Sequence, residues 1–458
     1  MSNVKLLIDF GSTFTKVIAV DIDENKIIAR TQVPSTVDKD ITIGLKQALE
    51  KIDITAHTNG QAKSEALACS SAAGGLRIVS IGFVPELTSE AATRAALGAG
   101  AKVVGCFSYE ITTQELNELK QIAPDIILLA GGTDGGDKKV IIHNARMLSK
   151  MELGNIHVLV AGNKAAQDEI SEIFSKSGNE ITFTKNVMPE IGKLDTEHCN
   201  QAIRNIFIKN IIETKGIAKA KEIVKDIIMP TPSAVLAAAK LLAEGYKDEK
   251  GYGDLIVIDI GGATTDIHSI SRGIPARKDI IMAGLPEPYV KRTVEGDLGV
   301  RLNIGTLIEL LQMRGILPDE RYDKAIMEIS KAGTLPKTKA QFSSDLLLAS
   351  IAVEVAVERH VGKIDIVYSP QGDMAVQRGK DLTGVKCAIG TGGPLVFSRD
   401  PGEIMKKCLF QEIQPHILRP KNPRFLLDGD YILYAAGLLS QTEPAAALAL
   451  MKKYLKDV

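Results

Sequence analysis

Two apolar runs in this chain end in the same way, in an aspartate followed by glycine and small hydroxyl residues. The first is Leu6-Leu-Ile-Asp-Phe-Gly-Ser-Thr-Phe-Thr-Lys-Val17, and the second is Ile256-Val-Ile-Asp-Ile-Gly-Gly-Ala-Thr-Thr-Asp-Ile267. In each run the β-branched and other apolar residues predict a buried strand, and the glycines predict a tight turn into a second strand. We therefore expect two hairpins built on one plan.

Between these hairpins the hydrophobic pattern changes to an alternation of strands and helices. Strands are expected over Arg77–Val84, Lys102–Phe107, Asp125–Ala130, His157–Val160 and Ile181–Thr184, and helices over Ser89–Gly98, Thr113–Ala123, Lys138–Met151 and Lys164–Ser177. Such alternation predicts a parallel, doubly wound sheet. The turn Gly131-Gly-Thr-Asp-Gly-Gly136 follows an apolar strand, at the edge where open α/β sheets bind ligands, although a tight turn alone would explain it.

The remaining pattern predicts a strand and several helices. A third strand is expected over Lys26–Val33, and helices are expected over Ile43–Ile52, within Glu190–Lys225, from Thr231 to about Tyr246, over Ser344–His360 and over Pro444–Asp457. The apolar residues of Glu190–Lys225 recur at helical spacing and are expected in a core.

Composition limits the classes of protein. The chain has 458 residues, of which 45% are hydrophobic and 24% charged, enough for two or three domains. A net charge of −1, 4% aromatic residues and no Trp argue against a nucleic-acid partner. No signal peptide or membrane-length apolar run is apparent, so a cytoplasmic protein is expected. The cysteines are scattered and odd in number, as in reduced thiols rather than a disulfide or metal framework: Cys69, Cys106, Cys199, Cys387 and Cys408.

The two predicted turns suit phosphate binding. Gly261 and Gly262 leave backbone N–H groups without a neighbouring Cβ, and hydroxyl groups follow at Thr264 and Thr265. The corresponding residues of the first turn are Gly11, Ser12 and Thr13. A single turn of this kind is often an ordinary hairpin, but two copies make that explanation weaker.

Asp9 and Asp259 stand at the strand ends, where they would face a bound anion. That arrangement is unfavourable unless a cation lies between. Mg²⁺ suits the position, because it accepts one or two carboxylates together with waters and phosphate oxygens. We therefore expect Asp9 and Asp259 to be metal-binding and catalytic.

The paired turns resemble the phosphate-1 and phosphate-2 loops of the actin, sugar kinase and heat-shock-70 ATPase superfamily. Three further motifs occur in the superfamily's order: Thr231–Ala239 resembles the first connecting helix, Ala388–Leu395 the adenosine motif and Gly429–Leu438 the second connecting helix. The resemblance implies an α/β protein with an actin-like (ribonuclease H-like) ATPase fold of two lobes, which binds ATP and Mg²⁺. The alternating segment is then an inserted doubly wound α/β domain, similar to flavodoxin or Rossmann domains.

This resemblance also implies roles for single residues. Lys16 would contact the β- and γ-phosphates, and the adenosine motif would supply Gly390, Thr391, Gly392 and Gly393. Glu295 and Asp297 would approach the nucleotide, unless they form only a helix-start turn.

Two positions depart from known patterns. Heat-shock ATPases place a glutamate for the attacking water where this chain has Thr231, so hydrolysis is expected to be slow. Asp266-Ile-His268 resembles part of a cobalt-ligating motif of cobalamin-binding domains. Ser271 replaces the glycine of that motif, so His268 is interpreted as a strand histidine.

The expected domain organisation has five segments. Residues 1–66 begin the first lobe, 67–190 form the insert, 191–252 return to the first lobe and its connecting helix, 253–430 form the second lobe, and 431–458 hold the second connecting helix and a terminal helix.

Along its whole length the chain resembles the glutamate mutase L family, which is unrelated to the mismatch-repair protein of similar short name. The stretches most particular to that family are Ala68-Cys-Ser-Ser-Ala-Ala-Gly-Gly-Leu-Arg77, Pro124–Gly136 and Glu295-Gly-Asp-Leu-Gly299. The resemblance implies an ATP-dependent, chaperone-like factor, with slow ATPase activity, whose partners are subunits of an adenosylcobalamin-dependent mutase. Glutamate mutase is the first such partner, and the factor would promote release or exchange of damaged cobalamin.

Other classes of function stay open at this point. A small-molecule kinase on the same fold would need a carboxylate base facing an acceptor, and a nucleotide-independent assembly partner of the mutase would need no ATP. Iron–sulfur activators on this scaffold require cysteines arranged around a cluster, which five scattered cysteines do not suggest.

Overall fold

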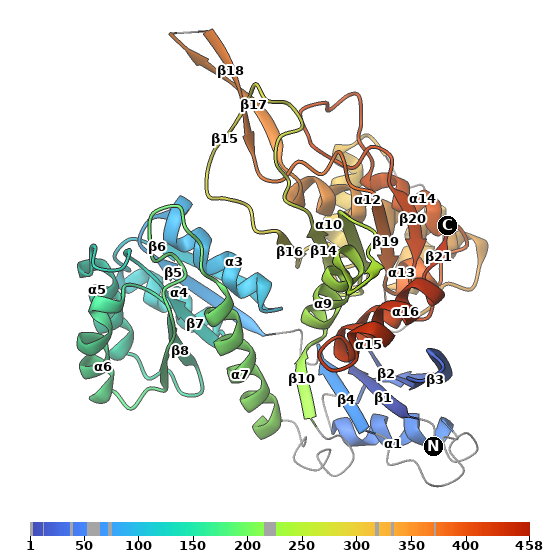
Figure 1. Cartoon of the computed structure of the whole chain (residues 1–458), viewed down its shortest axis with the longest axis horizontal. Coiled ribbons are helices and arrows are strands. Elements are labelled where there is room, and N and C mark those ends of the chain that lie inside the picture. The colour runs from blue at the N-terminus through green and yellow to red at the C-terminus, as the bar shows by residue number, and fades with distance from the viewer. Residues whose placement is uncertain are drawn as a thin grey trace. The chain divides into compact units, whose positions relative to one another are not determined.

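The computed structural model describes residues 3–11, 13–36, 40–52, 65–71, 76–214, 226–316, 320–330, 334–370 and 372–458. The chain forms two compact units, which are described separately (Figure 1). Unit 1 comprises Met1–Ser71, Lys219–Ala283 and Glu287–Val458, and unit 2 comprises Ala72–Ala218 and Gly284–Pro286.

The first sheet of unit 1 has the strand order β10-β4-β1-β2-β3. Its strands are β1 (Val4–Phe10), β2 (Phe14–Asp21), β3 (Lys26–Pro34), β4 (Glu65–Ser70) and β10 (Asp226–Pro230). The first three strands are antiparallel neighbours, while β4 runs parallel to β1 and β10 runs parallel to β4. Every residue of β1 is buried, including Lys5 and Asp9, and this burial on both faces explains why Leu6, Leu7 and Ile8 are apolar without alternation.

The second sheet repeats this connectivity, in the order β16-β14-β13-β19-β20-β21. Its strands are β13 (Leu255–Ile260), β14 (Thr265–Ile270), β16 (Val290–Glu295), β19 (Cys387–Thr391), β20 (Arg424–Leu427) and β21 (Lys456–Asp457). Strands β13, β14 and β16 are antiparallel neighbours, and β19 and β20 then add in parallel. The repeat predicted for the two hairpins thus extends to five strands of each sheet.

A helix follows the fifth strand of each sheet, and these two helices pack against each other. They are α9 (Thr231–Glu244) and α15 (Ile432–Leu439), and α16 (Pro444–Tyr454) packs beside them. One hydrophobic core contains Leu7 of β1, Val257 of β13, Leu236 of α9 and Leu438 of α15. The two sheets therefore share a core built around the crossing of α9 and α15.

The opposite face of the second sheet is covered by α12 (Lys339–His360) together with α10 (Ile304–Met313), α11 (Glu320–Ile329), α13 (Gly393–Val396) and α14 (Pro401–Met405). Helix α12 begins with a capping box between Thr338 and Gln341. Among the described residues α12 alone is long and apolar enough to cross a membrane, but 61% of its most apolar window is buried inside the protein. That burial is typical of a core helix.

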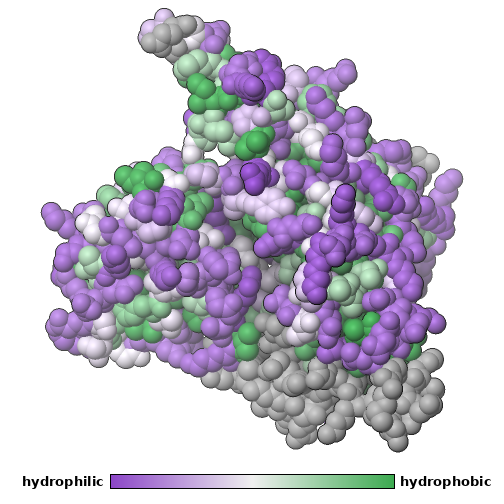
Figure 2. Space-filling view, viewed as in Figure 1, coloured by the Kyte–Doolittle hydropathy of each residue, from purple (hydrophilic) through white to green (hydrophobic). Residues whose placement is uncertain are grey.

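A small three-stranded sheet projects from unit 1 (Figure 1). It consists of β15 (Ile280–Met282), β17 (Lys363–Ser369) and β18 (Gly372–Arg378). Helix α1 (Ile41–Lys51) lies beside the first sheet. Apolar side chains of the projecting sheet, among them Ile366 and Tyr368, are exposed, and Figure 2 shows hydrophobic patches in this region.

Unit 2 is a parallel sheet in the order β6-β5-β7-β8-β9, with helices between the strands. Its elements are β5 (Arg77–Gly82), α3 (Glu90–Gly98), β6 (Lys102–Ser108), α4 (Thr113–Ile122), β7 (Ile126–Leu129), α5 (Lys139–Ser149), β8 (His157–Val160), α6 (Gln167–Ser175), β9 (Ile181–Phe183) and α7 (Glu197–Thr214). Counted along the unit, this order is 2-1-3-4-5, as in flavodoxin-like folds.

The limits of unit 2 differ from the segment 67–190 predicted for the insert. Residues 67–70 lie in β4 and pair with β1, and α7 is grouped with unit 2 rather than with the first lobe. The expected helix within Glu190–Lys225 begins only at Glu197. A short apolar strand and an apolar helix face do not reveal which of two cores they will join.

The glycine turn after β7 is held by buried asparagines. Asn163 accepts a hydrogen bond from the backbone N–H of Gly135 at 3.1 Å and donates one to the Gly136 carbonyl at 3.0 Å. Asn186 donates to the Gly132 carbonyl at 3.0 Å. The tight turn therefore accounts for these glycines without a ligand. A second turn of small residues is expected at Ser70–Gly75, but residues 72–75 lie outside the described part of the chain.

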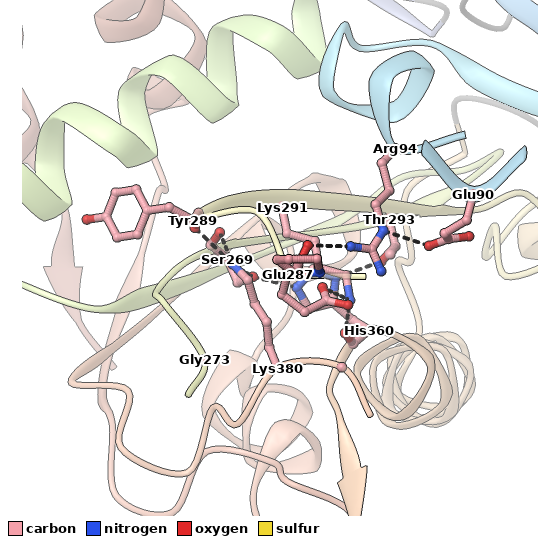
Figure 3. Close-up of polar contacts among 12 residues, drawn as sticks. Glu90, Arg94, Ser269, Gly273, Glu287, Tyr289, Lys291, Thr293, His360 and Lys380 are labelled. Atoms are coloured by element: carbon pink, nitrogen blue, oxygen red, sulfur yellow. Dashed lines mark hydrogen bonds and ion pairs between the residues drawn. The ribbon is translucent and has the colours of Figure 1, made fainter. Parts of the chain in front are cut away.

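Beneath the second sheet, a buried polar network surrounds His360 at the end of α12 (Figure 3). The His360 Nδ1 lies 2.9 Å from Thr293 Oγ1, and its Nε2 lies 2.8 Å from Ser269 Oγ. Lys291 donates to the His360 carbonyl at 3.0 Å, and Lys380 donates to Ser269 Oγ at 3.2 Å. Burial, followed by the positive charges of Lys291 and Lys380, holds the pKa of His360 well below its ordinary value.

The buried histidines His360 and His268 are expected to make the protein less stable in acid. Burial and the charge of Arg292 also lower the pKa of His268, to about 3. In the unfolded chain both imidazoles take up protons below about pH 6.5, while the buried ones stay neutral. The free energy of unfolding therefore has its full value above about pH 6.5. It decreases as the pH falls below 6.5, by up to ~2 kcal/mol per histidine at pH 5.

Urea unfolding of the wild type, His360→Gln and His268→Gln between pH 5 and 8 measures this effect. Each variant is expected to show a shallower decline of unfolding free energy toward pH 5 than the wild type. The matched control is His416→Gln, because His416 is exposed. Equal slopes for the wild type and the two buried-site variants would contradict the prediction.

Candidate functional site

The two hairpin turns close with the same hydrogen bond. The N–H of Gly11 donates to the Phe14 carbonyl at 3.1 Å, and the N–H of Gly261 donates to the Thr264 carbonyl at 2.8 Å. A Cβ at Gly11 would lie 2.6 Å from the Phe14 oxygen, and one at Gly261 would lie 3.0 Å from the Thr264 oxygen. Both turns are therefore tight at the same position, and the first leaves no room for a side chain there. Ser12, predicted beside Gly11, lies outside the described residues.

Asp9 is the next-to-last residue of β1 and is 1% exposed. The register of the hairpin places Asp9 opposite Lys16, whose Nζ donates to the Asp9 carboxylate at 3.0 Å. Thr231, the first residue of α9, donates its hydroxyl to the same carboxylate at 2.7 Å. Burial, the largest single influence, lowers the pKa of Lys16, but the charge of and hydrogen bond to Asp9, together with Tyr431 and Asp259, outweigh it and raise the pKa above its ordinary value. The ammonium group is therefore charged and bound to Asp9.

Asp259 occupies the matching place in the second sheet, opposite Asp266 in β14 and beside Thr391 in β19. Within the described part of the chain, no side chain donates a hydrogen bond to its carboxylate. Burial, followed by the charge of Asp266, raises the pKa of Asp259 to about 7; Lys16 opposes this shift, and Asp9 adds to it. The acidic groups at this site are thus incompletely neutralised by the protein itself.

Asp428 joins the same cluster. Its carboxylate accepts hydrogen bonds from the N–H groups of Ile432 at 2.6 Å and Leu433 at 3.2 Å, and so caps α15. The hydroxyl of Thr391 donates to it at 3.1 Å. Burial raises the pKa of Asp428 to about 6, although these bonds oppose the shift. No local signal indicates Asp428, because a capping aspartate is expected directly before a helix, where this chain has Tyr431.

The predicted adenosine motif forms the end of β19 and the start of α13. Gly392 has φ +94°, and a Cβ there would lie 2.1 Å from the Ile260 carbonyl oxygen. A Cβ at Gly390 would lie 2.8 Å from the Met405 sulfur, whereas Gly393 has more room. Gly392 thus lets this loop pass against the end of β13, next to Asp259.

Two predicted nucleotide contacts need correction. Thr265 and Glu295 are paired across β14 and β16, and alternation along the strands places them on the face opposite to Asp259 and Asp266. The Thr265 hydroxyl donates to the Leu298 carbonyl at 2.8 Å.

Glu295 and its neighbour Asp297 instead accept hydrogen bonds from Arg359 of α12, at 2.7 and 2.8 Å. Neither Thr265 nor Glu295 therefore joins the carboxylate cluster. Thr264, by contrast, remains at the turn, where its hydroxyl donates to Asp266 at 2.9 Å.

The carboxylates of this site suit Mg²⁺. No group of three or more His, Cys, Asp or Glu side chains within the described ranges could by itself hold a metal ion. Mg²⁺ does not need one, because it usually keeps several waters and binds one or two carboxylates with phosphate oxygens. The buried carboxylate of Asp9 and the partly buried carboxylate of Asp259 fit that requirement. Bound there, Mg²⁺ would neutralise phosphate charge.

The strand order 3-2-1-4-5 in both sheets, the two glycine hairpins with their aspartates, and the crossed helices α9 and α15 define an actin-like ATPase fold. Within that class the chain belongs to the MutL protein family, which matches residues 5–455. It is 47% identical over 461 residues to Protein MutL of Clostridium tetanomorphum, with 99% of each chain covered.

Solved structures with similarity to this chain are more distant. The ethanolamine utilization protein EutJ of Carboxydothermus hydrogenoformans is 12% identical, with 98% of this chain and 89% of that one covered and a TM-score of 0.27. A gluconate kinase of Lactobacillus acidophilus is 11% identical, with 99% and 93% covered and a TM-score of 0.33. Because both TM-scores are low, the assignment of the fold rests on the strand order and not on these similarities.

Proposed function

We propose that this protein is an ATP-dependent, chaperone-like reactivating factor for an adenosylcobalamin-dependent mutase, with glutamate mutase as its first partner. It would promote release or exchange of cobalamin that has lost its adenosyl group, and it would act in the cytoplasm. Membership of the MutL family supports the link to the mutase. The observation that carries the ATP dependence is the cluster of Asp9, Lys16 and Asp259, formed by two equivalent hairpins of one unit.

The two hairpins suggest how ATP would act. They belong to different sheets, so a Mg²⁺–triphosphate group that contacts both would favour one arrangement of the sheets over another. A ligand shifts such an equilibrium only by its differential affinity for the two arrangements. Unit 2 is proposed to engage the mutase. Hydrolysis would be slow, because Thr231 stands where the superfamily has a glutamate.

Recovery of mutase activity tests the proposal. Glutamate mutase is inactivated by loading it with a cobalamin that lacks the adenosyl group, and this protein is added with fresh adenosylcobalamin, with or without Mg-ATP. Recovery that requires both the protein and ATP is expected. Recovery without ATP would favour a nucleotide-independent assembly partner, and no recovery despite ATP binding would reject glutamate mutase as the partner.

Thr231→Val is expected to lower the rate of ATP hydrolysis roughly 10- to 100-fold, because hydrogen bonds to charged groups contribute about 1.5–3 kcal/mol. Valine keeps the shape of threonine but removes the donor to Asp9. Steady-state phosphate release measures the change. Thr231→Ser keeps a hydroxyl and should retain most of the rate. Equal rates for the valine and serine variants would contradict a role for this hydrogen bond.

A further inference from the structure

Tyr431 has an unusual backbone for an aromatic residue. Its φ of 55° and ψ of 37° are left-handed, and it stands directly before α15. Bulky side chains rarely adopt this conformation, which persists only where the surrounding structure holds it. The N–H of Tyr431 donates to the carbonyl of Asp428 at 3.3 Å. The turn that aims the Tyr431 ring therefore also carries the buried carboxylate of Asp428.

The ring of Tyr431 lies against the predicted phosphate-binding lysine. The Nζ of Lys16 is 4.5 Å from the centre of the Tyr431 ring and 5.9 Å from that of Tyr434. Its other partner is the Asp9 carboxylate, at 3.0 Å. Tyr434 is fixed in turn by a hydrogen bond from its hydroxyl to the Leu7 carbonyl at 3.2 Å. Lys16 of the first sheet is thus held by one carboxylate and by two rings from the start of α15.

These two supports respond differently to a bound cation. If Asp9 binds Mg²⁺, its negative charge is shared with the metal, and its hold on the Lys16 ammonium weakens. The face of an aromatic ring carries a permanent partial negative charge that no metal at Asp9 would take up. The contact between the Lys16 ammonium group and the tyrosine rings would therefore remain when Mg²⁺ is bound to Asp9 and Lys16 faces the phosphates.

We propose that Tyr431 is a positioning residue for Lys16: its ring carries the ammonium group when Asp9 binds Mg²⁺ and so keeps Lys16 directed at the phosphate chain of ATP. This inference rests on the proposed ATP binding. Tyr431 would act through Lys16 and would not contribute to binding of the adenosine part. Its removal should therefore weaken ligands in proportion to their phosphate content.

The test compares Mg-ATP and adenosine binding by calorimetry in three variants of the full chain. Tyr431→Phe keeps the ring, Tyr431→Leu removes it at similar bulk, and Tyr431→Asn removes it with a residue that tolerates the left-handed backbone. The leucine and asparagine variants are expected to bind Mg-ATP about 5- to 30-fold more weakly, the range of a partly desolvated cation–π contact. They should bind adenosine as the wild type does, and Tyr431→Phe should bind both ligands normally.

A double-mutant cycle isolates the pair. In a Lys16→Met background, Tyr431→Leu should cause no further loss of Mg-ATP affinity, because the group it supports is absent. Equal weakening of Mg-ATP and adenosine, or unchanged Mg-ATP binding in both ring-deleted variants, would overturn the inference. Either result alongside ATP binding by the wild type leaves the proposed function standing. Failure of the wild type to bind Mg-ATP would instead reject the proposed function.

Discussion

Replacing Asp259 by asparagine is expected to abolish ATP-dependent reactivation and to weaken Mg-ATP binding by at least about 100-fold. Asparagine keeps the shape of the side chain but removes the charge that would hold Mg²⁺. Changing a residue that only supports a metal ligand already lowers metal affinity or activity about 10- to 100-fold, so loss of a ligand itself should lower it at least as much. Calorimetric titration with Mg-ATP and the mutase recovery assay measure the two effects.

Stability distinguishes this outcome from misfolding. The pKa of Asp259 is raised to about 7, so the folded protein holds a proton that the unfolded chain releases near pH 4, and stability declines as the pH rises between these values. Without ligand above pH 7, Asp259→Asn should therefore melt at the same temperature as the wild type or higher.

The matched control is Asp365→Asn, since Asp365 lies in the projecting sheet and its carboxylate, within the described residues, forms only long ion pairs, with Lys363 and Arg378. It should leave Mg-ATP binding unchanged. Full ATP-dependent activity of Asp259→Asn would reject Asp259 as a metal-binding and catalytic residue.

Gly437→Ala is expected to be among the most destabilising single changes in the chain. Gly437 lies in α15 where it crosses α9, and a Cβ there would lie 1.9 Å from the Ala234 carbonyl oxygen. Neither helix backbone can yield locally, because both helices are buried in the shared core. Overpacking of this kind typically costs about 1–3 kcal/mol, and a clash with backbone should exceed that range.

The chain supplies a close control for this change. Gly429 precedes the same helix, and a Cβ there would meet no atom within 4 Å. Gly429→Ala should leave the urea midpoint nearly unchanged, while Gly437→Ala should shift it strongly or prevent folding. Similar midpoints for the two variants would contradict the prediction, because they would show that α9 and α15 can move apart to accept the added Cβ.

The fold class was accessible from the sequence because its strongest signals are local. An apolar run, an aspartate and a glycine define each hairpin within about twelve residues, and the predicted strand at His157–Val160 matches β8. Strand β10 was missed, since five residues ending in proline give too short a pattern. Its pairing with β4 depends on a contact between segments far apart in the chain.

Side-chain direction was the main obstacle at the site. Thr265 is close in sequence to Asp259, and Glu295 pairs with Thr265 across β14 and β16. Strand alternation turns both side chains toward α12, and a shift of one residue would reverse this. The bond from Thr231 to Asp9 spans 222 positions, so no local pattern could indicate it. Tyr431 was passed over because its role depends on a left-handed backbone that its residue type disfavours.

Duplication and fusion of one gene would produce this repeated strand order. An ancestor with one sheet and one helix after its fifth strand would have needed a second copy of itself to complete the shared core. After fusion, each half could diverge independently. The first half carries unit 2 between its fourth and fifth strands, where the second half has α13, α14 and a short 3-10 helix, Lys406–Cys408. An insertion at this place can therefore change without altering either hairpin.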